Sequence, residues 1–293
     1  MKKFFLLVFV FVAFGLYSQD FRIPNGKYRE ISDHQSFIGF SGSNVIEKWR
    51  SARDGKHVKI APLSGTYTLS VENKVNFLNV TWKNNIKEKF LVLISKRYDQ
   101  YVEFFLYNAD GKPCFIGISC DDGEYFGEHG MEGDIGMANY TFEISGISAS
   151  SSLREGSVSF TPDKINLNAN EAWSEGVRGN GIGEYIIINK HSAMQVDLYI
   201  SFGFVSYSKP NLFTDNARPK KIRVSWADIN RSQSLVIELA DTPNFQHIKI
   251  PMRDYNPDDY SYSGPLKIEI LEVYPGAKYT DTCIFAAYTY FSQ

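Results

Sequence analysis

Residues 173 to 184 read WSEGVRGNGIGE and run directly into the segment YIIIN at 185 to 189. Four glycines within eight residues (176, 179, 181 and 183) indicate a backbone that takes positive φ or lies very close to another segment. A phosphate-binding glycine loop needs a helix after it, so that the amides at the helix start face the anion. Because a strand-like run follows here, the stretch argues against a nucleotide-binding fold and indicates a turn leading into a strand.

The rest of the C-terminal half repeats short apolar or alternating runs. Residues 266 to 270 (LKIEI) show the period of two that buries one face of a strand. No amphipathic helix of more than two turns is evident, so the pattern predicts an antiparallel β-sandwich over residues 150–293. The serine-rich stretch 145–152 is typical of a domain boundary. The expected strands are 184–189, 193–204, 221–227, 234–239, 246–251, 266–274 and 283–290.

The N-terminal half, residues 20–147, shows the same period of two. Asn108 to Gly111 (NADG) separates two apolar runs, and its Asp-Gly pair is typical of a hairpin turn. Consecutive hairpin-linked strands predict an up-and-down β-barrel, so the fold class expected for the whole chain is all-β. The expected strands here are 37–40, 65–71, 75–82, 89–95, 100–107, 113–118 and 139–144.

The composition fits a globular protein and gives no electrostatic argument for nucleic-acid binding. The 293 residues are 43% hydrophobic and 22% charged, with a net charge of -2. The basic cluster at 218–223 alternates into an expected strand and indicates a charged outer face. We therefore expect no nucleic-acid partner.

The first eighteen residues are typical of a secretory signal. Lys2 and Lys3 precede an apolar run at 4–16, which is too short to span a bilayer as a helix, and Ser18 is a candidate cleavage site. We expect a secreted, periplasmic or cell-envelope protein without a transmembrane segment. Export permits disulfides, but the three cysteines leave the pairing of Cys114 with Cys120 open, and Cys283 is interpreted as a buried small apolar residue.

The C-terminal half resembles a known family over residues 150 to 291. The glycine-rich stretch, then ISFGF at 200–204, DNARPKKIRV at 215–224 and VYPGAKYTDTCI at 273–284 are similar in order to the NADase-type glycan-binding domain. The resemblance implies a discoidin-like, galactose-binding-like jelly-roll sandwich. It also implies a non-catalytic module that recognises carbohydrate, with no cofactor.

A sandwich of that kind binds ligand through loops at one end, where aromatic rings stack on sugars and polar groups bond hydroxyls. Seven residues in expected loops or at strand ends have this chemistry. For Trp173, a core position before the glycine turn is the competing interpretation. The candidates are Trp173, Arg178, Asn180, Tyr207, Asn211, Tyr260 and Tyr262.

Two segments are considered as possible metal-binding sites, and we expect no metal at either. The family pattern has an Asp-Gly before the tryptophan and a Glu after Cys283, but this chain has Asn168, Ala169 and Ala286 there. Calcium prefers several carboxylate and carbonyl oxygens, so the loss of two carboxylates argues against a calcium site. The acidic segment 121–134 lacks the ligand spacing of a calcium-binding loop and is interpreted as a solvated loop.

The N-terminal half resembles bacterial lipocalin-like domains, through GKY at 26–28, SGTY at 64–67 and VTW at 80–82. The resemblance implies a barrel that holds a small apolar ligand, and the competing interpretation is that the aromatic residues fill its core, as such side chains more often do. The chain contains no zinc-binding His pair and no nucleophile elbow. The leading interpretation is therefore a binding protein. An enzyme acting on a nucleotide or glycan, and a structural or adhesive envelope protein, remain as alternatives.

Overall fold

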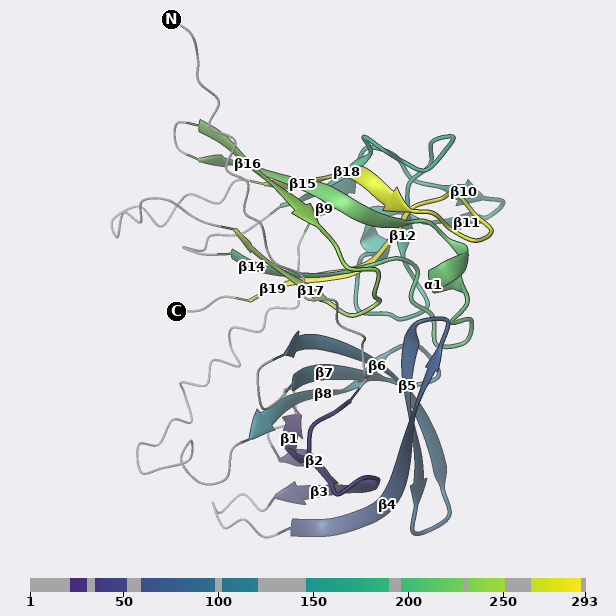
Figure 1. The fold of residues 1–293 in the computed structure, drawn as a ribbon, viewed down its shortest axis with the longest axis vertical. Helices are drawn as coiled ribbons and strands as arrows, with labels where there is room; N and C mark the ends of the chain where they lie inside the picture. The colour runs from purple at the N-terminus through teal and green to yellow at the C-terminus, as the bar shows by residue number, and fades with distance from the viewer. Residues whose placement is uncertain are drawn as a thin grey trace, which may run out of the picture.

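The structure is a computed structural model that describes residues 22–30, 35–51, 59–97, 102–120, 146–189, 196–228, 231–250 and 265–290. It confirms the all-β fold class: a barrel and a two-sheet sandwich lie one above the other in Figure 1. In those ranges the only helices are α1 (Leu212–Asp215) and the 3₁₀ turn η2 (Pro162–Lys164). Neither is long and apolar enough to cross a membrane. The expected signal segment, the strand 139–144 and the acidic loop lie outside the described residues.

Eight antiparallel strands close the barrel in chain order, and β1 returns to pair with β8. At the turn between β7 and β8, Gly111 has φ 78° and its N–H bonds Asn108, as the Asp-Gly pattern predicts. The strands are β1 (Gly26–Glu30), β2 (Ser36–Ser41), β3 (Val45–Ser51), β4 (Lys59–Glu72), β5 (Val75–Trp82), β6 (Lys87–Arg97), β7 (Val102–Tyr107) and β8 (Pro113–Cys120).

Side chains that alternate inward along these strands fill only part of the barrel. Tyr28, Phe40 and Phe104 meet edge to face with ring centroids 5.0–6.2 Å apart, and Tyr67 packs against Phe40 at 5.2 Å. Such T-shaped contacts match the positive edge of one ring to the negative face of another. These four rings belong to one buried core cluster inside the barrel.

The C-terminal half consists of two packed antiparallel sheets, in the orders β12-β19-β14-β17 and β16-β15-β18-β13-β9. Their strands are β9 (Ile147–Ala149), β12 (Trp173–Ser174), β13 (Tyr185–Ile188), β14 (Val196–Phe202), β15 (Arg218–Asp228), β16 (Arg231–Glu238), β17 (Gln246–Ile250), β18 (Leu266–Tyr274) and β19 (Cys283–Tyr290). A small hairpin of β10 (Arg154–Glu155) and β11 (Val158–Ser159) stands beside them.

Strand β19 carries no charged residue, and its side chains from Cys283 to Tyr288 are buried on both faces. Ile284 packs into the sandwich core, whereas Phe285 and Tyr288 face the barrel. A register shift opposite Ser201 and Phe202 forms a β-bulge, which turns Phe285 and Ala286 to the same side. The buried Cys283 at the strand start confirms its interpretation as a small apolar residue.

Barrel and sandwich share an apolar interface. The interdomain cluster joins outward residues of β5, β6 and β7 to one face of the sandwich, and Phe105 packs against Phe245 and Tyr288 with centroids 5.1 and 5.7 Å apart. Backbone bonds also cross it, because Ile94 receives a bond from the Phe245 N–H at 3.0 Å and donates to the Asn244 side chain at 3.0 Å. The barrel and the sandwich therefore share a buried interface and are not joined by the chain alone.

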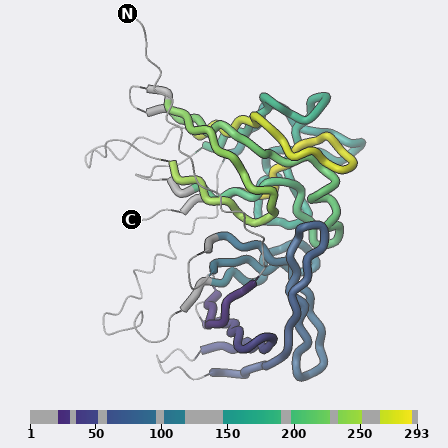
Figure 2. Tube along the Cα trace, viewed as in Figure 1, coloured from purple at the N-terminus to yellow at the C-terminus, as the bar shows by residue number. Residues whose placement is uncertain are grey.

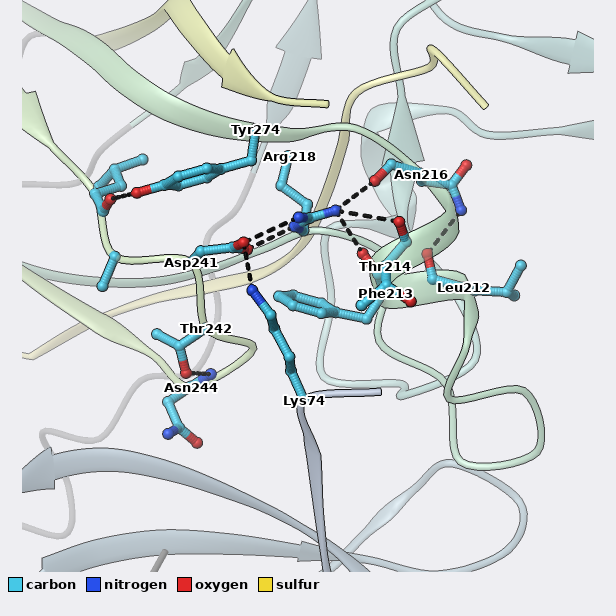
Figure 3. Close-up of polar contacts among 12 residues, drawn as sticks. Lys74, Leu212, Phe213, Thr214, Asn216, Arg218, Asp241, Thr242, Asn244 and Tyr274 are labelled. Carbon is cyan, nitrogen blue, oxygen red and sulfur yellow. Dashed lines mark hydrogen bonds and ion pairs between the residues drawn. The ribbon is translucent and has the colours of Figure 1, made fainter. Parts of the chain in front are cut away.

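The hairpin of β4 and β5 rises from the barrel to the sandwich (Figure 2) and carries Lys74 at its tip. Lys74 bonds Asp241 at 2.6 Å, and Arg218 grips the same carboxylate with two bonds of 2.7 and 3.0 Å (Figure 3). The Arg218 side chain is 7% exposed and also donates to the carbonyls of Phe213 and Asn216. A bidentate, charge-assisted arrangement of this kind fixes geometry as well as energy.

Candidate ligand-binding sites

A cavity of about 620 Å³ occupies one end of the barrel. It lies where β1 ends and β2 begins, and where the β3–β4, β5–β6 and β7–β8 connections are made. Its volume falls in the range of pockets that enclose small organic ligands. Exposed Arg50 and Ile60 stand at its rim, so the cavity meets solvent there.

The wall of the cavity is mostly apolar. The ring of Phe115 lines the cavity and stacks against Phe104 at 6.2 Å, so the aromatic cluster packs behind this part of the wall. Other apolar side chains that line it are Ile38, Leu63, Leu78, Phe90 and Leu106. Binding of an apolar ligand here would remove apolar surface from water, which is favourable by about 25 cal/mol per Å².

A small polar group interrupts that wall. Glu88 accepts a hydrogen bond from the Trp82 indole N–H and pairs with the Lys48 ammonium at 3.4 Å. The same ammonium lies 4.4 Å above the Trp82 ring, which is a cation–π contact. Deeper, Glu30 is 6% exposed and accepts a bond from the Ile116 N–H at 2.7 Å.

Cys114 also lines the cavity, and the structure describes it as a free thiol. The residue is exposed at the rim, but its thiol donates inward to the Leu106 carbonyl at 3.3 Å. Burial of the thiol, followed by the charge of Glu30, raises the pKa of Cys114 to about 11. The protonated thiol is a poor nucleophile at neutral pH. The side chain of Cys120, the suggested partner of Cys114, lies outside the described residues.

The glycine-rich loop at the end of the sandwich is fixed by a buried carboxylate. Glu175 is fully buried and accepts bonds from the N–H groups of Val177 at 2.8 Å and Thr282 at 3.2 Å. Burial raises its pKa, and those two bonds partly offset the rise. Gly181 has φ 66°, and a Cβ there would lie 2.5 Å from the Glu175 side chain, so both conformation and space require glycine.

The loop presents two of the predicted residues. Arg178 is exposed beside Val177 and Ile182, which are 40% and 58% exposed. Asn180 is half-buried, and its carbonyl receives a bond from the Thr282 hydroxyl at 2.8 Å. The structure thus places Arg178 and Asn180 on one preorganised loop with apolar neighbours.

Trp173 belongs to the sandwich core, so its prediction as a ligand contact is wrong. The side chain is fully buried, and its indole N–H donates to the Ser151 carbonyl at 3.0 Å. With its ring enclosed and its one donor bonded, it offers nothing to a ligand.

The other four predicted residues do not join this loop. Tyr207 lies at the barrel–sandwich interface, where its hydroxyl bonds the Lys89 carbonyl at 3.0 Å. Asn211 is exposed at the start of α1, and its amide bonds Asp215 at 2.8 Å. Tyr260 and Tyr262 lie outside the described residues.

The positions considered for calcium serve another purpose here. Ala169 and Ala286 are fully buried in the interdomain cluster, and the Ala169 N–H bonds the barrel carbonyl of Gly111 at 2.6 Å. Across the ranges that the structure describes, no three His, Cys, Asp or Glu side chains gather as metal ligands.

These features define a two-domain all-β protein with a discoidin-like C-terminal half. Residues 139–290, more than half of the chain, match the family described as NAD glycohydrolase translocation F5/8 type C domain. The chain belongs to this family.

Two further comparisons add no argument. A solved structure described as a glycoside hydrolase is 9% identical, with coverage of 89% of this chain and 69% of that chain and a TM-score of 0.33. A likeness of that size supports neither a fold nor an activity. Among curated proteins, no sequence matches.

Proposed function

We propose that this protein is an exported, non-catalytic binding protein whose barrel holds a small, largely apolar molecule. The observation that carries the proposal is the cavity of about 620 Å³, which is open at one end of the barrel and lined in part by aromatic rings. Its most nucleophilic side chain, Cys114, is protonated at neutral pH, which favours binding over nucleophilic catalysis. The F5/8 type C match favours a binding module for the second half.

The substitution Leu63→Trp tests the barrel. Leu63 is half-buried on the cavity wall, so an indole there should fill the space and weaken binding of the neutral fluorescent probe N-phenyl-1-naphthylamine by about tenfold or more. Probe fluorescence is titrated for both proteins. Val71→Trp is the matched control, because Val71 is 57% exposed and does not line the cavity. Unchanged binding in the Leu63 variant, or no binding by the parent protein, contradicts the proposal.

We further propose that the sandwich recognises carbohydrate through the glycine-rich loop. The exposed guanidinium of Arg178 supplies several donors, and Val177 and Ile182 offer apolar surface to the C–H face of a sugar. The bonds to Glu175 and from Thr282 hold the loop in one shape, which lowers the entropic cost of binding.

For Arg178→Ala we expect about tenfold weaker binding to any glycan that the protein captures on an array, because charge-assisted bonds are lost. Calorimetry with the captured glycan measures the change. Arg154→Ala is the control, since Arg154 is exposed on the separate β10–β11 hairpin. An array without signal, together with tight binding to a protein, would instead support an adhesive role. Turnover of NAD or of an oligosaccharide would contradict the non-catalytic assignment.

A further inference from the structure

We propose that the barrel cavity selects a lipophilic amine: a ligand with an apolar body and a cationic ammonium group directed at Glu88 and Glu30. This inference rests on the proposed ligand-binding function of the barrel and specifies the chemistry of the ligand. Two acidic and two basic side chains line the cavity, namely Glu30, Glu88, Lys48 and Arg50. Their signs balance, so the arrangement, not the sum, decides what the cavity prefers.

Glu30 is the most buried of the four at 6% exposed, and Arg50 is exposed at the rim. Between them, the side chains of Glu88 and Lys48 are similarly half-buried, 34% and 42% exposed. A ligand anion carried to the depth of Glu30 would meet a buried carboxylate of like charge, which is costly where the dielectric is low. A ligand cation would meet opposite charge at the same depth.

The protein already places a cation at this position. The Lys48 ammonium stands 4.4 Å above the Trp82 ring while it pairs with Glu88, so ring face and carboxylate together form an ammonium-binding corner. Lysine reaches the corner on a flexible stem, and the Lys48 side chain is 42% exposed. A ligand ammonium can therefore take the corner while Lys48 turns out to solvent.

The apolar wall suits the remainder of such a ligand. Leu78, Phe90, Leu106 and Phe115 line the same cavity as this corner. An alkyl or aryl chain laid along them leaves water, and its head stays beside Glu88. Neither feature alone selects an amine, but together they require one end of the ligand to be cationic and the other apolar.

Calorimetry with three ten-carbon probes tests the head group on the full chain. We expect decylammonium to bind about tenfold more tightly than 1-decanol, and decanoate to bind most weakly. Glu88→Gln should remove the advantage of the ammonium and leave decanol binding unchanged. Lys48→Met should strengthen decylammonium binding, since it removes the competing cation. Glu72→Gln is the control, because Glu72 pairs with Lys89 at 2.7 Å and does not line the cavity.

The outcomes separate the two proposals. If decanoate or decanol binds as tightly as decylammonium, or if Lys48→Met weakens decylammonium binding, the amine proposal is overturned and the cavity remains a ligand site. If none of the three probes binds, the proposed function of the barrel fails as well. Glu30→Gln provides a second variant that retains an acceptor for the Ile116 N–H, and it should also weaken decylammonium selectively.

Discussion

Replacing Phe285 with alanine is expected to lower the free energy of unfolding by about 3–5 kcal/mol, because a fully buried ring leaves a cavity between barrel and sandwich. Phe285 meets Tyr107 of the barrel with ring centroids 6.1 Å apart, so its loss weakens both halves. Urea unfolding measures the total effect. Hydrogen exchange followed by mass spectrometry should show faster exchange in β5 to β7 as well as in β14 and β19.

Phe104→Ala is the comparison for this variant. Phe104 is equally buried but lies inside the barrel, away from the interface. Its loss should accelerate exchange in barrel strands and leave β14 and β19 protected. If Phe285→Ala costs less than about 1 kcal/mol, or accelerates exchange in the sandwich alone, the interface does not couple the two halves.

Arg218→Met is the second large effect, with an expected loss of about 3–5 kcal/mol. Methionine keeps much of the volume but leaves the carbonyls of Phe213 and Asn216 without their donor. It also leaves the Asp241 carboxylate with Lys74 alone. Arg223→Met serves as the control, because Arg223 pairs with Glu269 at 3.3 Å on a surface where its side chain is 41% exposed. That pair should contribute less than about 1 kcal/mol.

The pH dependence gives an independent reading of the Arg218 network. Burial alone would raise the pKa of Asp241, but the hydrogen bonds from Arg218 and Lys74 outweigh it and hold the pKa below its ordinary 3.8. A carboxyl group whose pKa is lower in the folded than in the unfolded protein stabilises the fold at pH above its unfolded pKa. That stabilisation is lost as pH falls through its folded pKa. The parent protein should therefore have this stabilisation in full above pH 3.8 and lose it as pH falls from there through the lower folded pKa. In Arg218→Met the Asp241 pKa should move back toward or above 3.8, so the loss of stability that Asp241 causes in acid should be smaller, and an unchanged slope of stability against pH would count against the network.

Much of the fold follows from patterns that remain intact in the sequence. Residues 75–82, 266–274 and 283–290 are strands with the predicted bounds, because period-two alternation or a doubly buried apolar run marks each of them. In the barrel, the predictions missed β1 and β3, and in the sandwich they missed the short strands β9 to β12. Lys48 and Glu30 face the cavity from β3 and β1, so charged residues stand where the pattern requires apolar ones.

The candidate site was less predictable for the same reason. Places where a sequence breaks a local rule are often functional, and the breaks in β1 and β3 are the signal that points to the cavity. The glycines predict the sandwich loop from sequence. At Gly181 the reason is steric, because the backbone lies too close to the Glu175 side chain for a Cβ. The error at Trp173 arose because sequence alone does not show that Ser151 accepts its indole N–H.

The apolar seam between the halves has a consequence for how the protein would meet a partner. Aromatic packing, the two hydrogen bonds made by the Ile94 backbone and the Lys74–Asp241 contact hold the barrel cavity and the sandwich loops in one relative orientation. If the sandwich loop binds a glycan-covered surface, a ligand in the barrel cavity would be held at a fixed distance and orientation from that surface. A receptor that contacts both the barrel end and the sandwich loop would require their fixed spacing, so it would bind the whole protein more tightly than either half alone.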